Sequence, residues 1–149
     1  MNDVEGGTPS LLFQLHRSSG IFAIPIQYAA WVEALEERAI PMPQSPDHVA
    51  GVYQLHGKSI GIIDLGQLLG FGRLPARPSS KQCLIILANA QAGFLVDKVL
   101  GVELLCSPQS AGPLSAPFTH SVYSCARVNG MVLELDVPGL LARANAHMA

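Results

Sequence analysis

The stretch VAGVYQLHGKSIGIIDL, residues Val49–Leu65, decides the fold of this chain. Two short apolar runs, residues 49–55 and 59–63, flank the turn-forming residues His56-Gly57-Lys58, and this pattern predicts a β-hairpin. Asp64 follows the second run, where a carboxylate can accept hydrogen bonds from the free amides at the start of a helix. We therefore expect a hairpin that runs directly into one or two capped helical turns.

A similar pattern returns near the end of the chain, where Asp136 lies 72 residues after Asp64. In both places an apolar strand, an Asp, an apolar residue, two spacers and a double Leu follow one another. Upstream, Gly51-Val52-Tyr53 corresponds loosely to Ser121-Val122-Tyr123, and Gly57 corresponds to Gly130. Strand–Asp–helix junctions are common enough for this match to arise by chance. The alternative is two related small barrels, each ended by a capped helix and sharing an interface, because each half is marginally stable alone.

The rest of the chain consists of short apolar runs separated by turn residues, with residues 28–40 as the ambiguous part. That segment holds good helix formers, so propensity favours a helix there. Strands are expected at residues 11–16, 21–26, 81–88, 93–99, 102–105, 122–128 and 131–135, loops at 41–46, 71–80 and 107–117, and a terminal helix over residues 138–148. We assign Gly51, Gly57 and Gly130 to structural turns, and Asp64 and Asp136 to helix caps. Many short strands and two short helices predict an all-β protein with closed or nearly closed barrels.

The composition limits what the chain can bind. Its 149 residues are 49% hydrophobic and 13% charged, with a net charge of −2, which excludes intrinsic disorder and a basic surface for nucleic acid. With so few charges, apolar surface must be exposed, and such surface is typically an interaction site. Residues 1–10 are interpreted as a flexible polar arm without a secretion signal. No stretch is apolar enough to span a membrane, and the three cysteines are widely spaced, which favours a cytoplasmic protein with reduced thiols.

Motifs that would indicate catalysis fail in their context. Gly57-Lys58-Ser59-Ile60-Gly61 matches the nucleophile elbow of hydrolases, but that elbow joins a strand to a helix, and here Ser59 opens a strand. The five histidines are scattered and predict no metal site, and no cofactor pattern is present. We therefore expect a protein that is not an enzyme, with a small hydrolase using Ser59 as the remote alternative. Trp31, the only tryptophan, is either partly buried core or an anchor in an interface.

Several segments resemble the CheW family of chemotaxis coupling proteins, in the family's order and spacing. They are Phe22–Ile26, Ile40–Pro43, Val52–Leu65, Gly93–Val102 and Asn129–Asp136. The resemblance implies two five-stranded SH3-like barrels with short helices, in one domain over residues 11–149, and it implies that residues 28–40 are largely extended. The first subdomain would span about residues 17–75. The second would span about residues 81–137 plus the N-terminal strand, followed by the terminal helix.

The resemblance also implies a function, that of a non-catalytic scaffold or adaptor in a chemosensory array. Family members bridge the regulatory domain of the CheA histidine kinase to the cytoplasmic tip of a methyl-accepting chemoreceptor. Kinase and coupling protein alternate in rings through head-to-tail contacts. By this match Ile26, Ala29 and Val99 would line a receptor-binding groove, with Trp31 and His56 close to it. The resemblance implies no cofactor, no nucleic acid and no insertion into the membrane.

Two positions depart from the family pattern. His56 stands where members commonly have Arg, and Trp31 stands where many have Glu. Arg has a fixed charge and a planar set of donors, whereas His is shorter and changes charge near neutral pH. We therefore expect altered receptor recognition, in a specialised array such as one governing pili or another non-flagellar output. The alternative is a CheW-like adaptor recruited to a different signalling partner outside chemotaxis.

Overall fold

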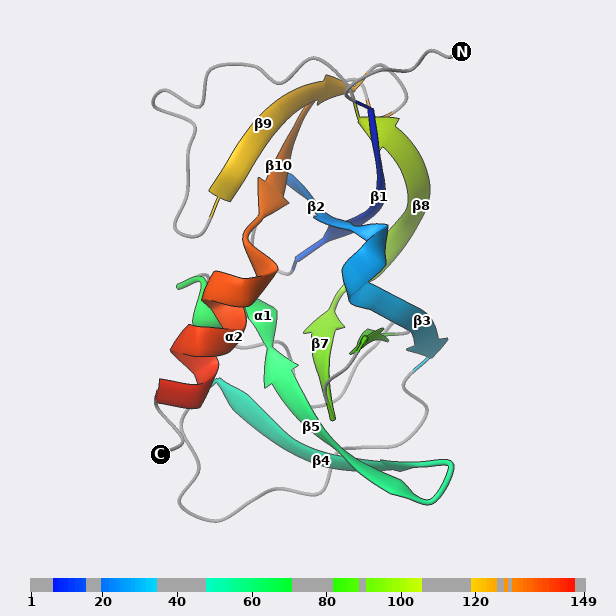
Figure 1. Cartoon of the computed structure of the whole chain (residues 1–149), viewed down its shortest axis with the longest axis vertical. Coiled ribbons are helices and arrows are strands. Elements are labelled where there is room, and N and C mark those ends of the chain that lie inside the picture. The colour runs from blue at the N-terminus through cyan, green and yellow to red at the C-terminus, as the bar shows by residue number, and fades with distance from the viewer. Residues whose placement is uncertain are drawn as a thin grey trace.

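The structure, a computed structural model, is all-β with short helices, as predicted from the sequence (Figure 1). It describes residues 7–15, 20–34, 48–70, 82–88, 91–105, 119–125, 128 and 130–146. The elements are β1 (Thr8–Gln14), β2 (Ile21–Pro25), the 3₁₀ helix η1 (Ile26–Tyr28), β3 (Ala29–Ala34), β4 (Val49–Leu55), β5 (Lys58–Asp64), α1 (Leu65–Leu68), β6 (Cys83–Leu87), β7 (Ala92–Val96), β8 (Lys98–Leu105), β9 (Thr119–Cys125), β10 (Gly130–Leu135) and α2 (Val137–Ala146).

The strands form two five-stranded sheets with the same internal order. The first, which we call the terminal sheet, has the order β8-β1-β2-β10-β9, and the second, the middle sheet, has the order β3-β6-β7-β5-β4. In each sheet one strand pair is parallel, β2 with β10 and β5 with β7, and the other pairs are antiparallel. Figure 1 shows the terminal sheet above the middle sheet, with α1 and α2 on the same flank of the molecule, near the junction of the sheets.

The register confirms that the two sheets are structural repeats. Tyr53 pairs with Ile60 in the middle sheet, and Tyr123 pairs with Val132 in the terminal sheet. Ile60 and Val132 are separated by the same 72 residues as Asp64 and Asp136. The predicted match of Gly57 to Gly130 is wrong by one residue, because Gly130 is the first residue of β10 and pairs with Cys125, as Lys58 pairs with Leu55.

The predicted subdomain limits do not follow the sheets. β2 belongs to the terminal sheet, although it falls within the predicted first subdomain, and β6 and β7 belong to the middle sheet, although they fall within the predicted second. The reason is a change of chain order: the hairpin β1–β2 holds the place in the terminal sheet that β6–β7 holds in the middle sheet. The predicted arm over residues 1–10 is also too long, because β1 begins at Thr8 and Ser10 is fully buried.

Two segments illustrate how sheet pairing overrides local propensity. In the described part of residues 28–40 the helix favoured by propensity is wrong and the extended conformation implied by the resemblance is confirmed, since Ala29–Ala34 is the edge strand β3, paired with β6; residues 35–40 lie outside the described residues. The predicted single strand over residues 93–99 is two strands, because the chain leaves the middle sheet after Val96 and enters the terminal sheet at Lys98. Between them the Asp97 amide donates to the Gln14 carbonyl at 3.1 Å.

A central hydrophobic cluster joins the two sheets and both helices. The terminal sheet contributes Phe13 and Phe22, whose stacked rings have centroids 6.2 Å apart, and the middle sheet contributes Phe94. Leu65 of α1 and Leu140 of α2 complete it. Each sheet also has a smaller cluster of its own; that of the middle sheet consists of Leu55, Ile60, Ile62, Leu84, Ile86 and Leu95. Because the largest cluster is shared, the two repeats stabilise each other.

Candidate partner-binding surface

The turn between β4 and β5 presents His56 at the tip of a tight hairpin. Leu55 pairs with Lys58, so the loop has two residues, and both have positive φ, 51° at His56 and 79° at Gly57. Two successive positive φ values are what a type I′ turn requires, and its twist matches that of the strands. The Gln54 amide donates to the Ser59 hydroxyl at 2.6 Å across the hairpin. The turn therefore places His56 at the exposed tip of the hairpin.

Trp31 on β3 meets this hairpin tip. The ring centroids of Trp31 and His56 lie 6.2 Å apart, with the ring planes inclined at 59°, an edge-to-face type of arrangement that aromatic rings prefer. Trp31 is 43% exposed, which excludes the core interpretation and leaves the side chain available to a partner. β3 and β4 are the two edge strands of the middle sheet. The contact between Trp31 and His56 therefore joins one edge of this sheet to the hairpin at its other edge.

The five residues predicted for the receptor-binding groove fall into two groups. Trp31 and His56 are exposed and touch each other, and Ile26 on η1 is 41% exposed. Ala29 and Val99 are half-buried and pack against the central cluster. Both lie next to the points where the chain crosses between the sheets, at η1 and at Asp97. They can therefore line a boundary between the sheets, but they offer less free surface than Trp31.

Sequence reasoning missed three further exposed apolar residues. Val32 on β3 is 39% exposed, and Val102 and Leu104 on β8 are 47% and 46% exposed. Val102 and Leu104 alternate along their strand and so share one face. The low charge content signalled that apolar surface would be exposed, but only the sheet order shows that β3 and β8 are edge strands.

The residues assigned to turns and caps have different outcomes. The Asp64 and Asp136 carboxylates each accept from the amide three residues later, at Gln67 and Gly139, both at 3.2 Å, which confirms both caps. Gly57 is confirmed in its turn. Gly51 lies inside β4 at a register shift, with φ 144°, so it belongs to a bulge rather than a turn. Gly130 opens a strand and is not among the positive-φ glycines of the described chain.

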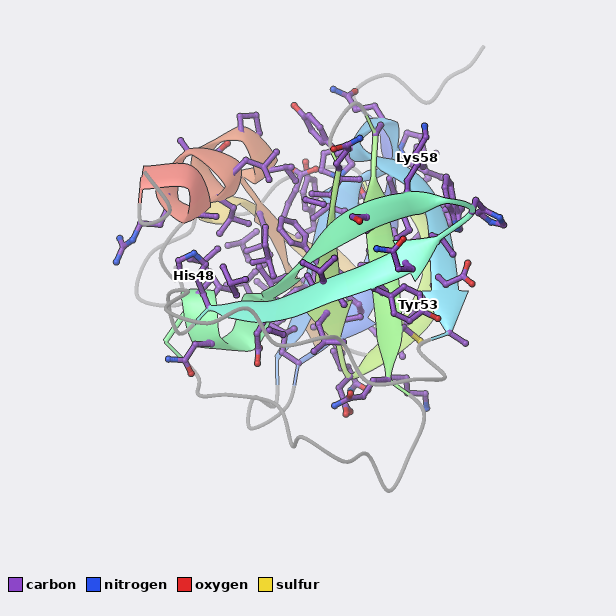
Figure 2. The ribbon with its side chains drawn as sticks, turned by 90° about the horizontal axis from the view of Figure 1, so that it is seen from below. His48, Tyr53 and Lys58 are labelled. Carbon is purple, nitrogen blue, oxygen red and sulfur yellow. The ribbon has the colours of Figure 1, made fainter. Side chains whose placement is uncertain are left out.

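His48 connects the start of the β4–β5 hairpin to the end of α2 (Figure 2). Its Nε2 lies 3.3 Å from the Ala144 carbonyl oxygen, and because a carbonyl only accepts, Nε2 must be the donor. Ala144 is in the last turn of α2, where carbonyls have no partner within the helix. The His48 carbonyl in turn accepts from the Asp64 amide at 2.7 Å. This histidine is structural; it lies at the opposite end of the hairpin from Lys58 (Figure 2).

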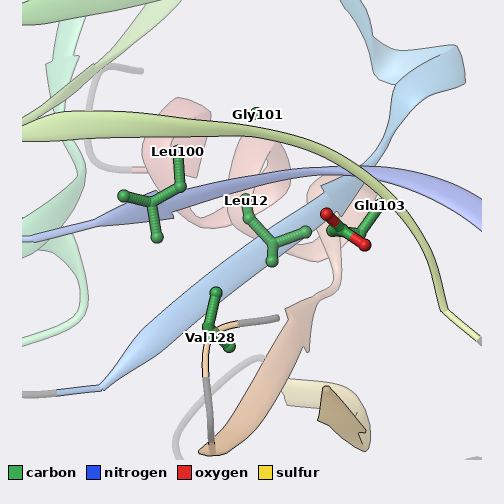
Figure 3. A pocket seen from close by; sticks show the side chains of 5 residues that line it. All are labelled: Leu12, Leu100, Gly101, Glu103 and Val128. Carbon is green, nitrogen blue, oxygen red and sulfur yellow. The ribbon is translucent and has the colours of Figure 1, made fainter. Parts of the chain in front are cut away.

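A small hollow lies beside β8, lined by Leu12, Leu100, Gly101, Glu103 and Val128 (Figure 3). Its volume is sufficient for about one water molecule. None of the five predicted groove residues lines it. Because of its small volume, the hollow can hold a water molecule but no larger ligand.

The structure also bears on the catalytic alternatives. Ser59 lies within strand β5 and its hydroxyl is held by Gln54, so the strand-to-helix geometry of a nucleophile elbow is not present at this motif. Within the described ranges, no three His, Cys, Asp or Glu side chains gather to hold a metal ion. Cys83 and Cys125 are free thiols, while Cys106 lies outside the described residues. Neither α1 nor α2, the described α-helices, has the length and apolar character to cross a membrane.

Comparisons with known proteins agree on one family. The family model described as "CheW-like domain" matches residues 9–145. A protein of Thermotoga maritima named "Chemotaxis protein CheW" is 38% identical over 106 residues, which cover 68% of each chain. The crystal structure of the scaffolding protein TtCheW from Thermoanaerobacter tengcongensis is similar with a TM-score of 0.70 and 20% identity, over 87% of this chain and 88% of that one.

Proposed function

The chain belongs to the CheW-like domain family, whose members are non-catalytic scaffold proteins of chemotaxis, and from that premise we propose that it bridges a CheA-type histidine kinase to chemoreceptors. One face would bind the regulatory domain of the kinase, and another would bind the cytoplasmic tip of a methyl-accepting chemoreceptor. The place of action would be the cytoplasm, at arrays of membrane receptors.

Exposed apolar side chains on the two equivalent edge strands are the observation that carries this proposal. β3 and β8 hold the same place in the two repeats, and together they expose Trp31, Val32, Val102 and Leu104. Apolar edge strands tend to associate with other chains and are usually covered. Two different apolar edges on one molecule are suited to head-to-tail contacts. Such contacts close into a ring when the rotation between successive molecules adds up to a full turn. A scaffold that alternates with a kinase of similar fold needs such a pair of faces.

The experiment that tests the proposal measures binding of the purified chain to a kinase regulatory domain and to a receptor-tip fragment. We expect both to bind. Trp31→Ala should weaken receptor binding with little change in melting temperature, because the side chain is exposed and Trp residues dominate interface energetics. Leu104→Ala is the comparison variant, since it removes similarly exposed apolar surface from the other edge and so tests the second face. The proposal would be rejected if the unmodified chain failed to bind one or both of these partners.

We assign the chain to a specialised array, such as a pilus or other non-flagellar system, because of His56 and Trp31. Their contact replaces the Arg and Glu charges of the family with a compact aromatic pair. His56→Arg should therefore strengthen binding to ordinary chemoreceptors. An unchanged affinity would count against altered recognition.

A second candidate is an adaptor for a signalling protein outside chemotaxis, favoured by the same two substitutions. The two functions differ in kinase binding, which only the first requires. A pull-down of the tagged chain from its own cell lysate, followed by mass spectrometry, would recover a CheA-type kinase and receptors in the first case. Recovery of a different signalling protein without the kinase would favour the second.

A further inference from the structure

The exposed indole of Trp31 has two neighbouring side chains in contact with it. Its Nε1 donates to the Glu33 Oε1 at 3.1 Å, and its ring contacts that of His56 at a centroid distance of 6.2 Å. Glu33 follows two residues later on the same strand, so the two side chains point to the same face of β3.

The supports of the indole are themselves fixed by the fold. Trp31 and Glu33 lie opposite Ile86 and Leu84 in the register, and directly opposite residues share a face of the sheet. Ile86 and Leu84 are buried in the cluster of the middle sheet, so the indole lies at the rim of a packed core. His56 is fixed by its left-handed backbone in the two-residue turn. The backbone positions of both supports are therefore set by β3 and by the β4–β5 turn.

We propose that Glu33 and His56 are positioning residues that hold Trp31 ready as an anchor for an apolar partner surface. The inference rests on the proposed function and deepens it, because it says how the receptor-binding face gains affinity. An exposed indole that is free to rotate loses conformational entropy when a partner immobilises it. An indole already held in place avoids that loss, so pre-organisation strengthens binding without adding a contact.

A double-mutant cycle separates positioning from direct contact. Glu33→Ala should weaken binding of a receptor-tip fragment about two- to tenfold, the usual effect of removing one hydrogen bond. Glu33→Gln keeps an acceptor oxygen and should bind like the unmodified chain. Trp31→Phe keeps an aromatic ring without the N–H, so adding Glu33→Ala to it should have no further effect. Equal effects of Glu33→Ala in both backgrounds would overturn the inference, because Glu33 would then contact the partner itself.

A second measurement needs no partner. The chain has one tryptophan, so the time-resolved fluorescence anisotropy of the intact protein reports the motion of the Trp31 indole. Glu33→Ala and His56→Ala should each increase its fast local motion, and Glu33→Gln should not. If no receptor tip binds, the proposed function fails while this measurement still decides on the positioning. Unchanged indole motion in both alanine variants would overturn the inference whatever the binding result.

Discussion

The middle sheet and the terminal sheet reach the same architecture from different orders of the chain. The middle sheet is contiguous from β3 to β7, whereas the terminal sheet takes β1 and β2 from the start of the chain and β8 to β10 from its second half. Their interiors also differ. Ile62 and Glu134 hold equivalent positions, opposite Gly93 and Ala23, and the buried Glu134 carboxylate accepts from the Tyr123 hydroxyl at 3.5 Å. Register and capped junctions therefore define the repeat, while chain order and core polarity can vary.

The largest expected effect tests whether the two sheets are one cooperative unit. Phe94 is fully buried in the shared central cluster, so Phe94→Ala should lower the free energy of unfolding by about 3–5 kcal/mol. Urea unfolding followed by Trp31 fluorescence, which reports on the middle sheet, should coincide with unfolding followed by far-UV circular dichroism. Two separate transitions would show that the terminal sheet folds without the middle one.

Gly93 and Ala23 allow a matched comparison at equivalent positions. A Cβ added at Gly93 would lie 2.9 Å from the Leu84 Cγ, and Leu84 is fully buried and cannot move away. Gly93→Ala should therefore destabilise the protein by about 1–3 kcal/mol, as overpacking does. Ala23→Gly should cost about 1–2 kcal/mol, because it removes a fully buried methyl group and also increases backbone entropy in the unfolded chain. Denaturant midpoints at constant m-value measure both, and a harmless Gly93→Ala would mean that the middle sheet packs less tightly there.

The two hairpin ends should respond differently to the same change. Gly57 has a left-handed φ with open space around its Cα, so Gly57→Ala should cost roughly 1–2 kcal/mol in backbone strain alone. At Gly130 a Cβ would meet the Val128 carbonyl oxygen at an ordinary 3.8 Å, and Gly130→Ala should be nearly neutral. Thermal unfolding of the two variants measures the difference. Equal decreases in melting temperature would indicate that Gly130, like Gly57, is needed for its backbone conformation.

The smallest effects concern the two helix caps. Asp64→Ala and Asp136→Ala should each cost about 0.5–2 kcal/mol, typical of a lost N-cap. The loss should be larger at Asp64, which is 1% exposed, than at the half-buried Asp136. Chemical denaturation of both variants and of the matching Asn substitutions, which retain an acceptor, provides the test. A neutral Asp64→Ala would contradict the role of this junction in the repeat.

Local features of the fold and the 72-residue repeat could be predicted from the sequence, whereas the pairing of distant strands could not. The β4–β5 hairpin and the Asp64 cap depend on neighbouring residues, so their patterns are visible in the sequence. The equivalent places of the hairpins β1–β2 and β6–β7 in the two sheets depend on pairing between distant strands. The alternation of apolar residues does not encode that pairing. The same holds for the surface: the family resemblance pointed to Trp31 and His56, but their contact depends on the curvature of the middle sheet. Glu33 was not singled out, because propensity favoured a helix, in which residues 31 and 33 would not share a face, and the extended conformation implied by the resemblance did not by itself show the contact between their side chains.

The order of strands in the terminal sheet has a consequence for synthesis of the protein. The β1–β2 hairpin leaves the ribosome first, yet the parallel partner of β2 is β10, almost the last segment to be made. The strands of the middle sheet are contiguous in the chain, so all of them are made before β10 can pair with β2. Unpaired strand edges in newly made chains are sites of aggregation and of chaperone binding. The edge of β2 that pairs with β10 therefore stays without its partner until nearly the whole chain has been made.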